Sequence, residues 1–173
     1  MSKIPAIACL DVAYGDAAAA VAGALIKSWD ADVPSQVLVR RFDGPAADYE
    51  PGAFYKRELP LLSAIISEFQ ERIEAIVIDG YVWLDAHGLS GLGGHLFASL
   101  RSGTPVIGVA KTRYQNDTWS IPVFRGASKR PLFVTSAGID VKKAAECVRQ
   151  MHGDHRIPTI LNLVDRVARD GLA

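Results

Sequence analysis

Three apolar segments with the composition of β-strands follow one another before the chain shows any helical period. They cover residues 4–14, 20–29 and 35–42, and the polar turn DADVP separates the second from the third. The next segment, residues 58–75, is predicted to be a helix with Pro60 in its first turn, where the missing N–H costs nothing. Its apolar residues recur at helical spacing: Leu62, Ile65, Ile66, Phe69 and Ile73. Three strands ahead of a helix indicate a hairpin series within a sheet.

From residue 75 onward, apolar strands alternate with helices. Further strands are predicted at residues 75–80, 104–112 and 131–137. Further helices are predicted at residues 91–103, 141–152 and 159–171. The order β-β-β-α-β-α-β, followed by more helix, favours an α/β protein of the ribonuclease H-like class, in which a mixed sheet carries helices on its faces. The length of 173 residues suits a single domain, residues 1–173.

The composition is that of an ordinary globular protein, with 49% hydrophobic and 22% charged residues. No apolar run is long enough to cross a bilayer, so we expect no membrane partner. The first residues, MSKIPAIACLDVAYG, lack the apolar core and cleavage site of a secretion signal. We therefore expect a cytoplasmic protein whose two cysteines, Cys9 and Cys147, are buried thiols rather than a disulfide.

Charge is distributed unevenly along the chain although the formal net charge is zero. The zero total excludes a global positive field that would attract nucleic acid. Residues 43–85 contain nine acidic and three basic residues, whereas residues 101–130 contain six basic residues and one acidic residue. This asymmetry would fit a cation-binding acidic site beside a phosphate-binding flank, and it would also fit ordinary solvated faces.

Three carboxylates lie within or beside apolar segments. Asp79 ends the strand AIVID, Asp11 lies within the first strand, and Glu58 precedes the first helix. If the first and fourth strands are neighbours, Asp11 and Asp79 converge and the start of the helix brings Glu58 close to them. Clustered carboxylates repel one another unless a cation lies between them, and Mg²⁺ prefers oxygen ligands. Lys111, after the strand VIGVA, adds a cation for a phosphate or a leaving oxygen.

Five segments, in order along nearly the whole chain, resemble the endonuclease V family. CLDVAY is similar to its first-strand motif, and YEPGAFYKRELPLL to its Tyr-x-Pro-Gly segment followed by an aromatic residue, Arg and Glu. IDG with GLGGHL resembles its Asp-Gly strand end and His-containing helix, PVIGVAKT its Ile-Gly-Val-Ala-Lys-Ser segment, and HRIPTILNLVDRVAR its C-terminal helix. The resemblance implies a nuclease that nicks DNA or RNA one nucleotide to the 3′ side of deaminated adenine (inosine), with Mg²⁺ or Mn²⁺.

The resemblance also implies roles for individual residues. Asp11, Glu58 and Asp79 would be metal-binding catalytic carboxylates, and Lys111 would contact phosphate. One loop would wedge into the nucleic acid beside the target base and would contain three of the substrate-binding residues: Tyr49, Pro51 and Gly52. Within this loop, Tyr49 is the candidate for stacking on a base, and it could equally be a half-buried loop tyrosine.

The loop after Asp79 departs from the family pattern. It reads GYVWLDAHGLS and lacks the paired arginines and the proline that the family usually has there. Positive charge is therefore missing where substrate should lie, and Trp83 offers an aromatic face that could stack on an exposed base. Large aromatic residues also dominate cores, so Trp83 could instead pack beneath the site.

Two further positions have a functional and a structural interpretation. His95, in GLGGHL, could reach the substrate or could pack its helix through a backbone hydrogen bond. The family's Val-Gly-His near the last strand is replaced by TSAGID, which removes a histidine. Asp140 in that segment could supply a fourth oxygen ligand, or it could cap the helix that follows.

Three functions are compatible with these residues. The first is an active endonuclease V that acts near inosine or has a changed preference. The second is a metal-dependent nuclease of the same fold with a different substrate class. The third is a catalytically weak homologue that binds nucleic acid or acts through a protein partner. The residues do not distinguish DNA from RNA.

Overall fold

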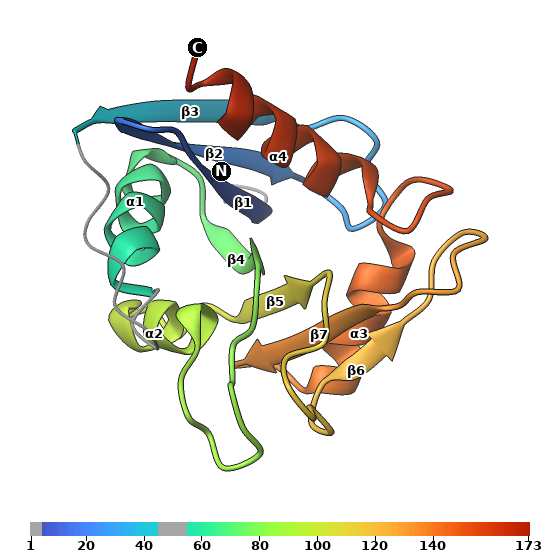
Figure 1. Ribbon diagram of the computed structural model, residues 1–173. Helices are drawn as coiled ribbons and strands as arrows, with labels where there is room; N and C mark the ends of the chain where they lie inside the picture. Colours follow the sequence, from blue (N-terminus) through green and yellow to red (C-terminus); the bar gives the residue numbers. More distant parts are fainter. Residues whose placement is uncertain (1–4, 45–54) are drawn as a thin grey trace.

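The computed structural model describes residues 5–44 and 55–173, which form one mixed sheet with helices on both faces (Figure 1). In chain order the strands of this described part are β1 (Ala6–Tyr14), β2 (Ala18–Ile26), β3 (Gln36–Asp43), β4 (Ile73–Asp79), β5 (Val106–Ala110), β6 (Ile121–Val123) and β7 (Leu132–Ala137). The helices are α1 (Tyr55–Glu68), α2 (Leu92–Ser99), α3 (Val141–Gln150) and α4 (Thr159–Asp170).

The strand order across the sheet is β3-β2-β1-β4-β5-β7-β6. β1, β2 and β3 pair antiparallel in series, as predicted for the first three segments. β4 joins the other edge of β1 in parallel, and β5 lies parallel to β4. β7 and β6 complete the sheet as antiparallel strands beyond β5. This arrangement confirms the predicted ribonuclease H-like fold.

Each face of the sheet has its own hydrophobic core because side chains alternate along a strand. On β1, Ala6, Ala8 and Leu10 face α1 and α2, whereas Ile7 and Cys9 face α3 and α4. β2 is buried along its whole length, as expected for a strand covered on both sides. Figure 1 shows α4 lying across β1 and β2 on one face, with α1 and α2 together on the other.

Several predicted boundaries were wrong. α1 ends at Glu68 because the chain turns back at residues 69–72, so Ile73 begins β4 although it stands at helical spacing from Phe69. Pro60 lies inside α1, beyond its first turn, where it removes one backbone hydrogen bond. β6 was not predicted, since a three-residue strand with Pro at its centre carries little periodic signal.

Both cysteines are free thiols, and Cys9 is fully buried in β1. Burial raises the pKa of the Cys9 thiol to about 12, so it stays protonated and behaves as a small apolar side chain. Within residues 5–44 and 55–173, no helix combines the length and the apolar character that a membrane crossing requires.

Candidate active site

Asp11 and Asp79 lie on neighbouring parallel strands at the same end of the sheet. Leu10 of β1 pairs with Ile78 of β4, so the two aspartates follow the last paired residues. Both side chains lie on the face covered by α4, because Val77 belongs to the core on that face and side chains alternate along each strand. Both residues line one small cavity beneath α4, as the prediction of converging carboxylates requires.

Lys111 directly follows β5, the next strand in the sheet. Its ammonium nitrogen, Nζ, donates a hydrogen bond to Oδ2 of Asp79 at 3.1 Å. Partial burial lowers the pKa of Lys111, but the combined attraction of Asp79, Asp11 and Asp165 outweighs it and the net shift is upward. Lys111 is therefore a stable cation at the edge of the carboxylate cavity.

Glu58 reaches the same end of the sheet from the first turn of α1. Its neighbour Arg57 fixes this turn against β1, because the guanidinium carbon lies 4.5 Å from the centre of the Tyr14 ring. Burial, followed by the negative charges of Asp11 and Asp79, raises the pKa of Glu58 to about 8, although the positive charge of Arg57 acts in the opposite direction. The structure thus brings Glu58 within electrostatic range of both aspartates.

Asp11 has few groups that stabilise its charge. Burial is the main cause that raises its pKa to about 6, followed by repulsion from Asp79. The N–H of Val12 donates to Oδ1 at 2.8 Å, and Lys111 attracts the carboxylate, but these two effects do not outweigh the burial. A site of this kind has an excess of negative charge that a bound cation would neutralise.

Asp165 of α4 is a site residue that the sequence analysis missed. Its charge raises the pKa of Asp11 and that of Lys111, which shows that α4 brings it close to both. It forms an ion pair with Arg169, one turn along the helix. Asp165 borders the buried stripe of α4, four residues after Leu161, and a carboxylate beside an apolar stripe was the signal that could have identified it.

The donor set fits a hard divalent cation by its chemistry. Asp11, Glu58 and Asp79 supply carboxylate oxygens, which Mg²⁺ prefers. Within residues 5–44 and 55–173, no three His, Cys, Asp or Glu side chains are already arranged as a complete metal site, so binding would have to draw the carboxylates together. The cavity between β1, β4 and α4 measures about 20 Å³, which is room for about one water. A nucleic acid would therefore bind outside this cavity.

Tyr49, Pro51 and Gly52 lie outside the described residues. His95 of α2 stacks on the ring of Tyr55, with 3.5 Å between ring centres and 16° between planes. Because Tyr55 begins α1, this contact joins α2 to the turn that carries Glu58, and no contact of His95 with the carboxylates is seen among the described residues.

Trp83 lies in the long loop between β4 and α2, which projects from the sheet in Figure 1. Its indole N–H donates to the carbonyl of Ser136 at 2.9 Å, and the half-buried ring packs against the core under α1 and α2. Ser136 pairs with Ile107 near the start of β5, at the end of this strand away from Lys111. The structure therefore does not bring Trp83 together with the carboxylates.

Asp140 caps helix α3. Its Oδ1 accepts hydrogen bonds from the backbone N–H groups of Lys142 and Lys143, both at 3.1 Å. This is the ordinary role of Asp before a helix. Asp140 also follows β7 at the end remote from Lys111, so the structure gives the capping interpretation rather than a fourth ligand.

The glycines of GLGGHL allow α2 to lie close to the loop that follows β4. A Cβ at Gly91 would lie 2.6 Å from the carbonyl oxygen of Tyr81, and one at Gly94 would lie 2.7 Å from that of Val82. Any side chain at these positions would displace the loop backbone. The glycines thus position the segment that follows Asp79.

A family model described as endonuclease V matches residues 1–129, which include Asp11, Glu58, Asp79 and Lys111. The chain belongs to the endonuclease V family. No curated protein sequence matches this member of the family.

Solved endonuclease V structures share the fold of this family member. The Bacillus subtilis protein superposes with a TM-score of 0.81 at 19% identity, covering 96% of this chain and 80% of that one. The Streptomyces avermitilis protein gives 0.72 at 23% identity, covering 99% and 83%. The Ciona intestinalis protein, with an inosine-containing DNA, gives 0.70 at 17% identity, covering 98% and 86%.

Proposed function

We propose that this protein is a Mg²⁺-dependent endonuclease that hydrolyses a phosphodiester bond near deaminated, inosine-type bases in DNA or RNA. The observation that carries the proposal is the convergence of Asp11, Glu58 and Asp79 beside Lys111, in a chain of the endonuclease V family. The inosine-containing DNA bound by the Ciona intestinalis relative supports the choice of base.

Asp11 and Asp79 would hold Mg²⁺, with Mn²⁺ as a substitute, and Glu58 would bind it directly or through a water. A bound divalent ion supplies Lewis-acid charge for the phosphate and for an attacking water. Glu58, which reaches the site from α1 on the other face of the sheet, would help to orient that water. Lys111 is exposed and paired with Asp79, so its ammonium can stabilise negative charge on the phosphate or the leaving oxygen.

Asp11→Asn tests the carboxylate site directly. The substitution keeps the shape of the side chain but removes its charge, so we expect cleavage to fall by roughly 10²-fold or more, the scale for loss of one electrostatic group at a reacting centre. Binding to an oligonucleotide in EDTA should survive, because a phosphate loses a repelling neighbour. The matched control is Asp140→Asn, since Asn caps a helix as well as Asp does. Cleavage by Asp11→Asn at the normal rate would place the active site elsewhere.

The base preference needs a substrate panel. Inosine-containing, uracil-containing, abasic and undamaged oligonucleotides, in DNA and in RNA, should each be incubated with Mg²⁺, Mn²⁺ or EDTA. We expect cleavage of the inosine substrates that EDTA abolishes. Equal cleavage of undamaged and inosine strands would instead favour a nuclease of different preference, for which the absence of Arg and Lys from the loop after Asp79 is the motive.

A further inference from the structure

A group of exposed cations continues the line of the candidate active site across the sheet. Lys111 directly follows β5, and the neighbouring strand β7 begins two residues after Arg130. Ala110, the residue before Lys111, pairs with Phe133, so the end of β5 lies beside the start of β7. Four side chains surround this edge, and we call them the basic cluster: Arg113, Lys129, Arg130 and Arg156.

Contacts within the described residues place the cluster next to Lys111. Arg156, from the connection between α3 and α4, donates through Nε to the carbonyl of Arg130 at 3.1 Å and through Nη2 to that of Pro131 at 2.9 Å. The same Nη2 also donates to the carbonyl of Lys111. Arg113 lies with its guanidinium carbon 5.3 Å from the centre of the Phe133 ring.

Ion pairs within the part of the chain that the structure describes leave the charge of the cluster unneutralised. Among residues 5–44 and 55–173, no carboxylate forms an ion pair with Arg113, Lys129, Arg130 or Arg156. Arg156 donates its hydrogen bonds to backbone carbonyl groups, which are neutral, so its positive charge is not paired with a negative one. The acidic residue nearest to Arg113 in sequence, Asp117, is buried and accepts hydrogen bonds from Tyr81, Trp119 and Ser120. Asp154, two residues before Arg156, is exposed and acts on the buried Arg125.

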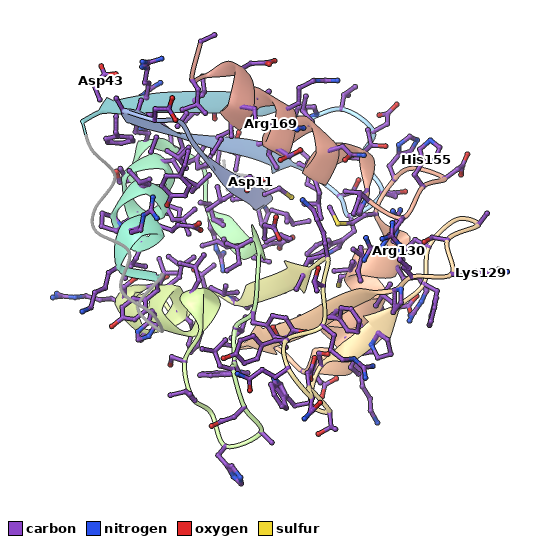
Figure 2. The ribbon with its side chains drawn as sticks, in the orientation of Figure 1. Asp11, Asp43, Lys129, Arg130, His155 and Arg169 are labelled. Atoms are coloured by element: carbon purple, nitrogen blue, oxygen red, sulfur yellow. The ribbon has the colours of Figure 1, made fainter. Side chains whose placement is uncertain are left out.

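The exposed side chains of the cluster point to a solvent-facing role. Arg113, Lys129 and Arg130 are exposed, whereas the other arginine of this region, Arg125, is buried and holds carbonyls of the α3–α4 connection. Figure 2 shows Lys129 and Arg130 beside His155 on one flank of the molecule. Arg125 is therefore a structural cation that stabilises the α3–α4 connection. Arg113, Lys129 and Arg130 are instead accessible to a ligand.

We propose that the basic cluster binds the sugar–phosphate backbone of the strand being cut, on one side only of the cleaved bond. This rests on the proposed function. Asp11 and Asp79 lie on β1 and β4, whereas Lys111 and the basic cluster lie at β5 and β7. A negatively charged region is therefore followed by a positively charged one along this end of the sheet. From β4 to β7 is two strand spacings, about 10 Å, or about three nucleotides at the rise of 3.4 Å per nucleotide in duplex DNA.

The contact would be independent of base sequence. Arginine and lysine bound to phosphate position a strand but read no bases. Arg156 would act as a positioning residue, because it joins the carbonyl of Lys111 to that of Arg130 and so fixes the catalytic lysine relative to the outer cations. The cluster would also supply positive charge that the loop after Asp79 lacks.

The test is the salt dependence of binding. The dissociation constant of a fluorescent inosine-containing oligonucleotide is measured in EDTA, which prevents cleavage, between about 50 and 200 mM salt. Arg113→Gln and Arg130→Gln should each lower the slope of log K against log salt by about 0.7–0.9, the value for one phosphate contact. Arg101→Gln is the matched control, since Arg101 is exposed before the start of β5 and should leave the slope unchanged.

A second experiment locates the contact along the strand. A neutral methylphosphonate is placed at each linkage in turn, and binding by the wild type should weaken at positions on one side of the cut, about three nucleotides away. The Arg113→Gln, Arg130→Gln double variant should lose this sensitivity, while its thermal melting stays that of the wild type.

The outcomes separate the two proposals. Failure of the wild type to bind any oligonucleotide would overturn both the proposed function and the phosphate surface. Binding with unchanged slopes in both variants would overturn the phosphate surface alone and would assign the cluster to another partner, such as an acidic protein. Equal loss in Arg101→Gln would also overturn it, since the effect would then be one of net charge.

Discussion

At the scale of single residues, Asp11 of the candidate site and the structural Asp117 differ in the number of hydrogen-bond donors that contact each carboxylate. Asp117 is only 3% exposed, and although burial raises its pKa, hydrogen bonds from Ser120, Tyr81 and Trp119 outweigh this and hold the pKa below its ordinary value. Asp11 receives one backbone N–H and its pKa rises. A carboxylate with too few donors in the protein is suited to a ligand that brings positive charge.

Trp83 gives a residue-scale prediction. Trp83→Phe keeps an aromatic ring but removes the N–H that bonds to Ser136, so we expect a loss of about 1 kcal/mol in the free energy of unfolding. Affinity for an inosine-containing oligonucleotide should not change, because the ring lies apart from the carboxylates. Chemical denaturation and a binding titration measure the two quantities. Normal stability with weakened binding would instead support stacking of Trp83 on a base.

At the scale of elements, β5 holds the loop that follows Asp79. A Cβ at Gly108 of β5 would lie 2.4 Å from the carbonyl oxygen of Gly80 and 2.9 Å from Oγ1 of Thr135. That Oγ1 accepts a hydrogen bond from the N–H of Val82 at 2.8 Å. The first residues after β4 therefore rest directly on β5 and β7.

Gly108→Ala should disturb this contact. The added methyl group must displace backbone, so we expect a loss of about 1–3 kcal/mol in the free energy of unfolding and slower cleavage as Asp79 shifts. Gly15→Ala is the control, since its Cβ would meet only ordinary contacts of 3.7 Å or more and its stability should stay close to that of the wild type. Denaturant titrations of both variants provide the measurement, and equal stability of the two would contradict the close contact.

The elements also show what the sequence could predict. Apolar and β-branched composition predicted the strands of Asp11 and Asp79, and the ends of apolar segments indicated Glu58 and Lys111 as candidates. Asp165 was missed, because a carboxylate beside the apolar stripe of a helix is a weak signal that most solvated acids share, and the packing of α4 is what brings it to β1. The boundary at Ile73 failed for a related reason: helical spacing continued by chance across a turn.

At the scale of the whole molecule, metal binding should stabilise the fold. A ligand that binds only the folded state adds about 2.7 kcal/mol when its concentration is 100 times its dissociation constant. For a chain of this length, that corresponds to a rise of roughly 5–10 °C in Tm. We expect this rise with Mg²⁺ in a thermal melt, and none with Asp11→Asn. A wild-type Tm that is insensitive to Mg²⁺ and Mn²⁺ would contradict the metal site.

The position of α4 over β1 has a consequence for the synthesis of the protein. β1 carries Asp11 and leaves the ribosome early, whereas Asp165 and the rest of α4 follow after about 8–30 s at translation rates of roughly 5–20 residues per second. Until α4 packs against the sheet, the cavity beside Asp11 and Asp79 is open to solvent. One face of β1 and β2 is then also exposed. The cavity lined by Asp11 and Asp79 is therefore complete only after residues 159–170 have left the ribosome.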